Sequence, residues 1–320
     1  MTLPSLLVYT VYIILPIGIA VYYSLTKYSG IGKPTFVGFL NYARMLEDKV
    51  FWTSLKNTMI MFVLAFSLLL TLSFLLALLL NSRLKFADLS KSLIFSPAII
   101  APIIVGIIWV YILDPNIGII NNLLDAIGAS ALKQKWISGE VLSPYSIAVI
   151  YFWQQLSYLT TIFIAGLKMI PEDVLEAATI DGTTFPQKVR FVILPMMKTT
   201  ISTVAVLIIT GVFKIFEIVQ QTTGGGPNHL SETLVTYSYA QTFDSGNYGY
   251  GMSLATITCL LSLLITAIYS LLTRKRRTDH DQKADKADPV SGDDPHHPGG
   301  GVSFFVDADA LLQIQRRDPV

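Results

Sequence analysis

The sequence predicts an all-α membrane protein with six transmembrane helices. Of its 320 residues, 52% are hydrophobic and only 14% are charged, whereas a soluble domain carries about 25% charged residues. Six stretches that lack charged side chains approach or exceed the roughly 20 residues that a helix needs to cross a bilayer. A net charge of +1 gives no indication of nucleic-acid binding. The chain is therefore expected to contact membrane lipid and not to bind nucleic acid.

The six predicted spans follow one another along the first 273 residues. They are residues 6–25, 59–80, 92–113, 141–167, a fifth that begins in the run 199–213, and one within 245–273. The fifth run is short, so this helix is expected to continue past Lys214 and Glu217. The first run has no basic residue before it and contains Pro16, which favours a retained span over a cleaved signal peptide.

Lys and Arg residues are distributed unevenly between the two sides of the predicted membrane domain. One set of loops carries eleven of them and the other set carries seven. Cytoplasmic loops are the richer in Lys and Arg, and an even number of spans puts both termini on one side, so both termini are predicted to be cytoplasmic. The eleven residues are Arg83, Lys85, Lys91, Lys168, Lys188, Arg190, Lys198, Arg274, Lys275, Arg276 and Arg277.

Two prolines, Pro97 and Pro102, lie inside the third predicted span. Each removes a backbone donor and bends a helix, and Gly106 follows nearby. Two interpretations stay open. The prolines either break a helix that lines a translocation cavity, as in many transporters, or form a kink that a membrane helix tolerates.

The fifth predicted span contains the charged residues Lys214 and Glu217. A charge at the centre of a bilayer costs about 2.5–3.5 kcal/mol on insertion scales. On a continuous helix, residues three positions apart share a face and can pair. We expect the two side chains to face a cavity on the translocation path, and the alternative is an interfacial pair whose charged groups reach the water.

Residues 171–195 form the only long charged segment within the membrane part of the chain. Pro171 suits the start of a helix, and Glu172 and Asp173 then lie at its positive end. Gly182 is placed to end that helix in a left-handed turn, and a second helical stretch follows. The segment is predicted to be a helix-turn-helix projection, although an ordinary polar connector would have a similar composition.

Spacing within this segment carries a resemblance to a known family. It resembles the EAA loop of the membrane-spanning permease subunits of binding-protein-dependent ABC importers, with mild departures at Thr183, Thr184 and Val189. The matching residues are Glu176, Ala177, Ala178, Asp181, Gly182, Gln187, Val192, Leu194 and Pro195. In that family the loop is a coupling helix that docks into a cleft of the ATPase subunit, which is helix-in-groove recognition.

Two outer segments extend the resemblance to this family, and the second of them resembles the carbohydrate-uptake class, related to the maltose and glycerol-3-phosphate systems. Residues 114–118 with Asn121 resemble a "P-x-x-G-x-x-N" region, and residues 222–228 resemble a "T-x-G-G-P" turn. The resemblance spans residues 1–277. It implies a permease without catalytic residues, cofactor or metal, which works with a second homologous permease, two ATPase subunits and an external solute-binding protein in the cell membrane.

The chief alternative is a secondary transporter driven by an ion gradient. Such a protein is expected to carry ionisable residues in several spans, whereas only Lys214 and Glu217 qualify here. A membrane-embedded enzyme is a third class, but the sequence contains no catalytic constellation. The solute itself is not identified by these residues.

Residues 278–320 differ in composition from the predicted membrane domain. They contain nine acidic and four basic residues, and eight of these 43 residues are Pro or Gly. Such a segment is expected to be a disordered cytoplasmic tail. His296 and His297 have no accompanying ligands, so no metal site is predicted. The single cysteine, Cys259, excludes an internal disulfide and is expected to be a packing residue.

Overall fold

The computed structural model describes residues 3–81 and 94–287, with side chains up to residue 273. The described chain is mainly helical, as predicted, and falls into two units, residues 1–273 and 274–320. Four helices are long and apolar enough to cross a membrane, and a bent pair raises the number to five. The predicted number of six spans therefore stays a prediction.

The first candidate span, Leu3–Ser24, consists of α1 (Leu3–Tyr9), a π-helical segment at Thr10–Ile14 and α2 (Leu15–Ser24). None of its apolar window is buried within the chain. The antiparallel strands β1 (Thr26–Lys27) and β2 (Thr35–Phe36) follow, with Thr26 opposite Phe36, and α3 (Leu40–Glu47) leads to the next span.

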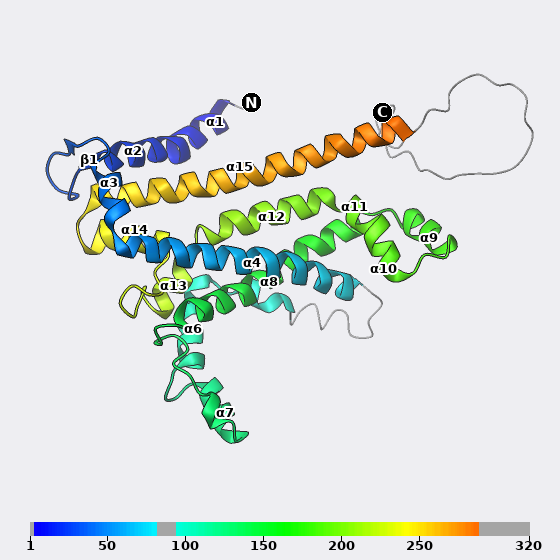
Figure 1. Ribbon diagram of the computed structural model, residues 1–320, viewed down its shortest axis with the longest axis horizontal. Coiled ribbons are helices and arrows are strands. Elements are labelled where there is room, and N and C mark those ends of the chain that lie inside the picture. The colour runs from blue at the N-terminus through cyan, green and yellow to red at the C-terminus, as the bar shows by residue number, and fades with distance from the viewer. Residues whose placement is uncertain (1–2, 82–93, 288–320) are drawn as a thin grey trace, which may run out of the picture. The chain divides into compact units, whose positions relative to one another are not determined.

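The core is built by three long helices that lie alongside one another (Figure 1): α4 (Lys49–Asn81), α8 (Ser143–Lys168) and α12 (Lys198–Val212). Small side chains on α4 allow close approach, which is how membrane helices pack without help from water; Ser73 and Ala77 are fully buried there. Large buried side chains such as Phe163 and Ile208 fill the space between the helices.

Close contact between α8 and α12 depends on glycine. A Cβ at Gly166 of α8 would lie 2.7 Å from the side chain of Thr200, and one at Gly211 of α12 would lie 2.6 Å from the Tyr151 hydroxyl. No other residue therefore fits at either position without displacing its neighbour. These two glycines fix the spacing of the helices that carry the cavity described below.

The third predicted span is broken rather than continuous. Residues 94–99 are helical, the helix is interrupted at Ile100 and Ala101, and α6 (Pro102–Leu113) begins at the second proline. A short helix α7 (Ile119–Ala126) and a 3-10 turn at Ser130–Leu132 lead to α8. Residues 92 and 93 of the predicted span lie outside the described residues.

The fifth predicted span is also broken, and here the expectation of one helix through Lys214 and Glu217 is wrong. Helix α12 ends at Val212, and α13 (Glu217–Thr222) begins after a gap of four residues. On its other side, α12 is bent by 74° against the segment Phe185–Met196. Outer residues then form α14 (Leu234–Tyr239) and a π-helical turn at Ala240–Asp244.

The last helix, α15 (Tyr248–Ala287), contains the candidate span Tyr248–Thr273. It continues beyond residue 277, where the sequence predicts the end of the membrane domain, and the rest of the predicted tail lies outside the described residues. Its first turns pack with α3, α4 and α14 in a second apolar cluster that includes Met45, Leu234 and Leu254.

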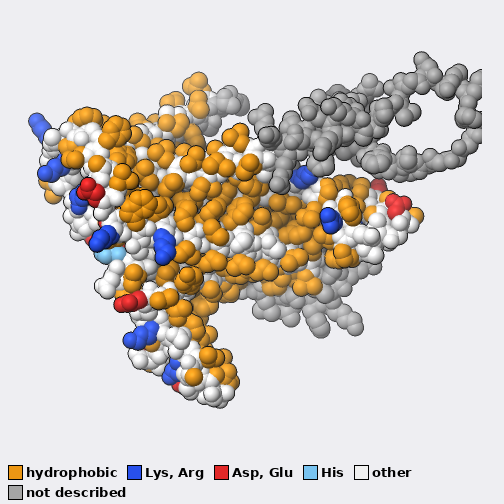
Figure 2. Space-filling view, viewed as in Figure 1, with side chains coloured by type: hydrophobic (Ala, Val, Ile, Leu, Met, Phe, Trp, Pro, Cys, Tyr) orange, Lys and Arg blue, Asp and Glu red, His pale blue; other side chains and the backbone are white. Residues whose placement is uncertain are grey.

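Hydrophobic side chains cover the middle of the face shown in Figure 2, and charged side chains gather toward its ends. The strands and α3 lie near one end, and α9 (Glu172–Ile180) and α10 (Phe185–Lys188) lie near the other (Figure 1). An apolar band between two polar ends is the surface that a bilayer requires. Several of its members are large and exposed, including Val63, Leu75 and Leu263.

Candidate functional site

The projection at residues 171–195 begins with a helix whose first turn is acidic. Pro171 precedes α9, and Glu172 and Asp173 occupy its first turn, where the helix dipole favours negative charge. The helix ends at Ile180 with Asp181 as its C-cap, and Gly182 follows with φ of 76°. A residue with a Cβ is strained in this left-handed conformation, which explains the glycine.

Hydrogen bonds fix the turn and the start of the second helix. The N–H of Gly182 donates to the carbonyl of Thr179 over 3.0 Å. Thr184 caps α10, and its N–H donates to Oε1 of Gln187 over 2.8 Å, which completes a capping box. Lys188 reaches back to the Thr179 hydroxyl at 2.5 Å and ties the two helices together.

Side chains of the projection divide into an inner and an outer set. Ala178 is buried, and its carbonyl accepts the N–H of Thr183 over 3.2 Å. Ala177, the other alanine of the motif, is exposed, and the docking of either alanine against the ATPase subunit stays a prediction. The other predicted site residues are exposed as well: Glu176, Asp181, Gly182, Gln187, Leu194 and Pro195.

Large apolar side chains stand on the outside of the same projection. Ile180 is 86% exposed, and Phe185 and Phe191 are about two-thirds exposed, at 64% and 65%. Three large exposed apolar side chains within twelve residues are consistent with a surface for contact with another molecule. Unlike the side chains of the apolar band, these three have charged and polar residues as neighbours in the sequence, which is typical of a protein-binding surface.

A small cavity lies where the two broken helices meet. Its volume is about 110 Å³, and polar or charged groups from three helical segments contribute to its wall. The lining consists of Pro102, Tyr151, Gln154, Gln155, Gly211, Lys214, Ile215, Phe216, Glu217 and Ile218. The structure thus brings three of the predicted path residues together: Pro102, Lys214 and Glu217. The fourth, Pro97, is buried and is not part of this lining.

Lys214 lies within the break between α12 and α13, and Glu217 is the first residue of α13. Both residues are exposed at the surface of this single chain. The predicted shared face of one helix is therefore replaced by one charge within the break and one at the start of α13. Whether they pair during transport stays a prediction.

Gln154 supplies a free acceptor beside these charges. Its side chain is only 4% exposed, and Nε2 donates to the carbonyl of Ile100 over 2.8 Å. That bond satisfies a carbonyl that the break before Pro102 releases. Within the described residues, Oε1 of Gln154 has no hydrogen-bond partner, and such a buried acceptor costs about 1–3 kcal/mol if it stays unpaired.

Gln154 was not among the residues singled out from the sequence, and neither were Gln155 and Tyr151. A signal was present, because a pair of adjacent glutamines within an otherwise apolar predicted span is unusual. The residues that face them come from segments 50 or more positions away. Only the fold shows that the two glutamines meet both helix breaks.

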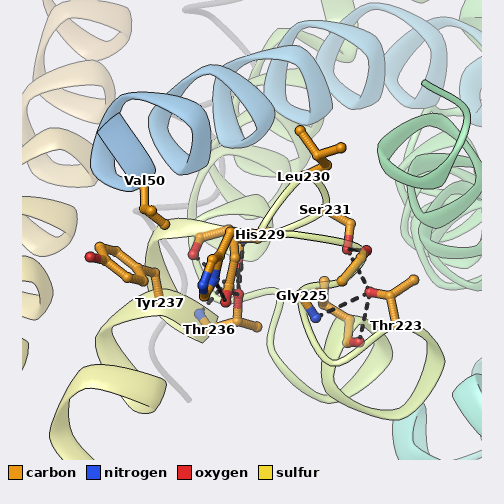
Figure 3. A network of polar contacts seen from close by, with 12 residues as sticks. Val50, Thr223, Gly225, His229, Leu230, Ser231, Thr236 and Tyr237 are labelled. Atoms are coloured by element: carbon orange, nitrogen blue, oxygen red, sulfur yellow. Dashed lines mark hydrogen bonds and ion pairs between the residues drawn. The ribbon is translucent and has the colours of Figure 1, made fainter. Parts of the chain in front are cut away.

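The outer loop after α13 forms a separate polar network (Figure 3). Gly224 and Gly225 have positive φ values of 57° and 84° and form the tight turn that the sequence predicts. The Ser231 hydroxyl donates to Thr223 Oγ1 over 2.7 Å. Glu232, which the sequence did not indicate, is buried at the centre of this network with 3% exposure.

The second outer motif is a structural clamp. Asn121 is buried, and its amide donates to the carbonyls of Pro115 and Gln134, each over 3.0 Å. Backbone N–H groups of Ile117 and Asn116 donate to the Asp114 carboxylate and lower its pKa below the ordinary 3.8. These contacts close the loop on itself, so the motif organises the segment between α6 and α8.

Comparison with known proteins places this architecture in a family. The family model described as "Binding-protein-dependent transport system inner membrane component" matches residues 85–278. The chain belongs to this family. It is therefore a multi-pass membrane component of an ABC transport system and not the subunit that catalyses ATP hydrolysis. Membership in this family excludes the alternative function, a secondary transporter driven by an ion gradient.

Relatives match nearly the whole membrane part. A probable ABC transporter permease protein of Pyrococcus horikoshii is 30% identical over 269 residues, which cover 83% of this chain and 92% of the relative. The trehalose/maltose transport system permease protein MalF of Thermococcus litoralis is 30% identical over 87% of this chain and 93% of its own length.

A solved structure shows the same fold. A chain of a bacterial ABC transporter that imports the acidic polysaccharide alginate superposes with a TM-score of 0.76, covering 86% of this chain and 94% of the other. The identity is 20%, so this likeness concerns the fold alone.

Among the described residues, no group of three or more His, Cys, Asp or Glu side chains could hold a metal ion.

Proposed function

We propose that this chain moves a sugar or sugar-like solute into the cell. A second homologous permease, two ATPase subunits and an external solute-binding protein complete the importer. The trehalose/maltose permease among its relatives supports the carbohydrate class, and the sn-glycerol-3-phosphate permease UgpA of Yersinia pestis, 27% identical, supports a small polar solute. Six spans with both termini in the cytoplasm are part of the proposal.

The observation that carries the proposal is the cavity between the two helix breaks. Its charged side chains on Lys214 and Glu217 are able to bind hydroxyl groups, and Gln154 lines the same cavity among apolar spans. At about 110 Å³, the cavity is smaller than the roughly 300–1,000 Å³ of sites that enclose a ligand. The second permease is expected to supply the opposite wall.

The projection at residues 171–195 is proposed to couple this cavity to ATP. Exposed Ile180, Phe185 and Phe191 offer an apolar surface to a groove on the ATPase subunit. When ATP draws the two ATPase subunits together, the projections follow, and the spans that continue from them change from an inward-open to an outward-open arrangement. ATP drives this change because it binds one state more tightly than the other.

Transport assays test the proposal directly. The complete complex is reconstituted in vesicles with its binding protein, and uptake of maltose, trehalose and sn-glycerol-3-phosphate is measured with and without ATP. We expect ATP-dependent uptake of at least one of these solutes, and Glu217→Gln is expected to reduce it. Uptake that follows an ion gradient and ignores ATP would contradict the proposal. A reporter fused after Arg277 that is active only outside the cell would contradict the topology.

A further inference from the structure

The break between α12 and α13 needs a hydrogen-bond donor from elsewhere in the chain. Ile215 lies within the break and is buried, and a buried carbonyl within a membrane domain must be paired. The Thr233 hydroxyl donates to the carbonyl of Ile215 over 3.2 Å. Thr233 caps α14 on the far side of the outer loop, so the loop supplies the partner that the broken helix lacks.

The hydroxyl of Thr233 is directed by a chain of hydrogen bonds. A carboxylate only accepts hydrogen bonds, so the Thr236 hydroxyl donates its proton to Oε2 of Glu232 over 2.6 Å. The Thr236 oxygen then accepts the N–H of Thr233 over 2.9 Å. The Thr233 oxygen in turn accepts the N–H of Thr236 over 3.3 Å. This reciprocal capping holds Thr233 with its hydroxyl 3.2 Å from the carbonyl of Ile215.

Glu232 is itself held from several directions. Its Oε1 lies 3.1 Å from Nδ1 of His229, and its backbone carbonyl accepts the Asn57 amide of α4 over 3.0 Å. Gly225 packs directly against the carboxylate and leaves no room for a Cβ. Such a buried charge is retained only where its partners are fixed, because a charged acceptor without partners is costly.

We propose that Glu232 is a positioning residue for transport. Through Thr236 and Thr233, it holds the break between α12 and α13 in its observed geometry. That geometry places Lys214 and Glu217 at the two sides of the cavity. The inference rests on the proposed translocation path, but it concerns how the path is kept open and not which solute passes.

A chemical reporter at the break tests this inference. Cys259 is exposed, so it is first replaced by Ser, and Lys214→Cys then provides a single thiol at the cavity. The full complex is purified in detergent, and the rate of reaction with a soluble maleimide is measured. In this background we expect Glu232→Leu to change the labelling rate by about fivefold or more, as expected for loss of an orienting hydrogen bond.

Matched variants distinguish positioning from general packing. Glu232→Gln keeps a carbonyl acceptor for Thr236 and is expected to label within about twofold of the parent. Thr256→Val is a control, because the Thr256 hydroxyl donates only within its own helix, to the carbonyl of Met252 over 2.8 Å. It is also expected to leave the rate unchanged.

If the Glu232→Leu protein does not reach the membrane, Thr236→Val and Thr236→Ser decide. Val removes the hydroxyl and is expected to change the rate, whereas Ser keeps it. Equal labelling of the Leu and Gln variants, or of the Val and Ser variants, at equal abundance would overturn the inference. Labelling requires no solute, so this outcome is distinct from a failure of the parent complex to take up sugars.

Discussion

The Tyr250 hydroxyl donates a hydrogen bond to Oδ2 of Asp48 over 2.6 Å, although the two residues are 202 positions apart. Tyr237 donates to the same oxygen, and the N–H of Val50 donates to Oδ1 over 2.8 Å. One carboxylate at the end of α3 thus joins the start of α4 to α14 and to the first turn of α15. Arg44 stacks on the Tyr250 ring at 4.6 Å and closes the cluster.

Asp48→Asn is expected to destabilise the protein by about 1–2 kcal/mol at neutral pH, because hydrogen bonds to a charged group are replaced by weaker ones. Burial raises the pKa of Asp48, but the hydrogen bonds from Tyr237, Tyr250, Val50 and Phe51 outweigh it, so the net pKa lies below 3.8. The carboxylate therefore stabilises the fold above about pH 3.8 and loses this effect as the pH falls through the lower, folded-state pKa.

Thermal unfolding of the detergent-solubilised protein checks this expectation. The difference in Tm between the parent and Asp48→Asn should be largest near neutral pH and should shrink at acid pH. Asp125→Asn is the control, since Asp125 and Lys133 form an exposed ion pair at 2.7 Å, and exposed pairs contribute about 0–1 kcal/mol. A difference in Tm for Asp48→Asn that grows toward acid pH would contradict the interpretation.

Gly182→Val is expected to weaken coupling between the permease and its ATPase. The space around Gly182 is open, with nothing within 4 Å of a Cβ, so the entire penalty comes from the left-handed backbone and amounts to about 1–2 kcal/mol. Asn tolerates this conformation, so Gly182→Asn should behave nearly as the parent does. Solute-stimulated ATPase activity of the reconstituted complex is the measurement. Equal activity of the Val and Asn variants would show that the turn geometry is unimportant.

The two alanines of the projection should respond differently to enlargement. Ala177 is exposed and Ala178 is buried, so Ala177→Trp should leave membrane abundance normal and block docking of the ATPase subunit. Ala178→Trp has no room and should lower abundance itself. Copurification with the ATPase, normalised to permease, separates the two effects. If Ala177→Trp retains full binding, the outer face of α9 is not the docking surface.

Gly211→Ala should narrow the cavity. An added Cβ would lie 2.6 Å from the Tyr151 hydroxyl, and Tyr151 lines the cavity next to Gln154. We expect reduced uptake with about 1–3 kcal/mol of destabilisation, as overpacking gives. Tyr151→Phe removes the atom in conflict, so the double variant should recover uptake. Recovery is measured as ATP-driven transport, and its absence would place the effect of Gly211 elsewhere.

A double-mutant cycle on Lys214→Met and Glu217→Gln tests whether the two charges interact during transport. If they pair in another state of the cycle, each single change strands one charge and should reduce uptake more than the double change does. A coupling of about 1 kcal/mol or more is expected. Additive effects on the uptake rate would indicate that each charge acts independently.

Local turn chemistry was the most predictable part of this molecule. Gly182 could be assigned its left-handed conformation because it follows an apolar helical segment. Pro102 indicated either a helix break or a kink, because its ring excludes a backbone donor. These features depend on neighbours within a few residues. The burial of Ala178 could not be predicted locally, because it depends on how the whole projection meets the membrane helices.

The break at Ile215 could not be predicted from local sequence. The apolar run before it contains no proline, and Lys214 and Glu217 have the spacing of a helical pair. The break is stabilised by the Thr233 hydroxyl, which donates to the carbonyl of Ile215 from 18 positions away. Gln154 is an intermediate case, because its type is conspicuous in a span while its partner at Ile100 is known only from the fold.

Helix α4 has a mechanical consequence for the protein. Its 33 residues extend for about 50 Å at 1.5 Å per residue, which exceeds a hydrocarbon layer of about 30 Å. Near one end, Asn57 donates to the carbonyls of Leu230 and Glu232 in the outer loop, and at the other end Leu80 is buried in the core. The helix is therefore a rod with both ends attached, and tilting it about its middle moves the outer loop and the opposite end in opposite directions.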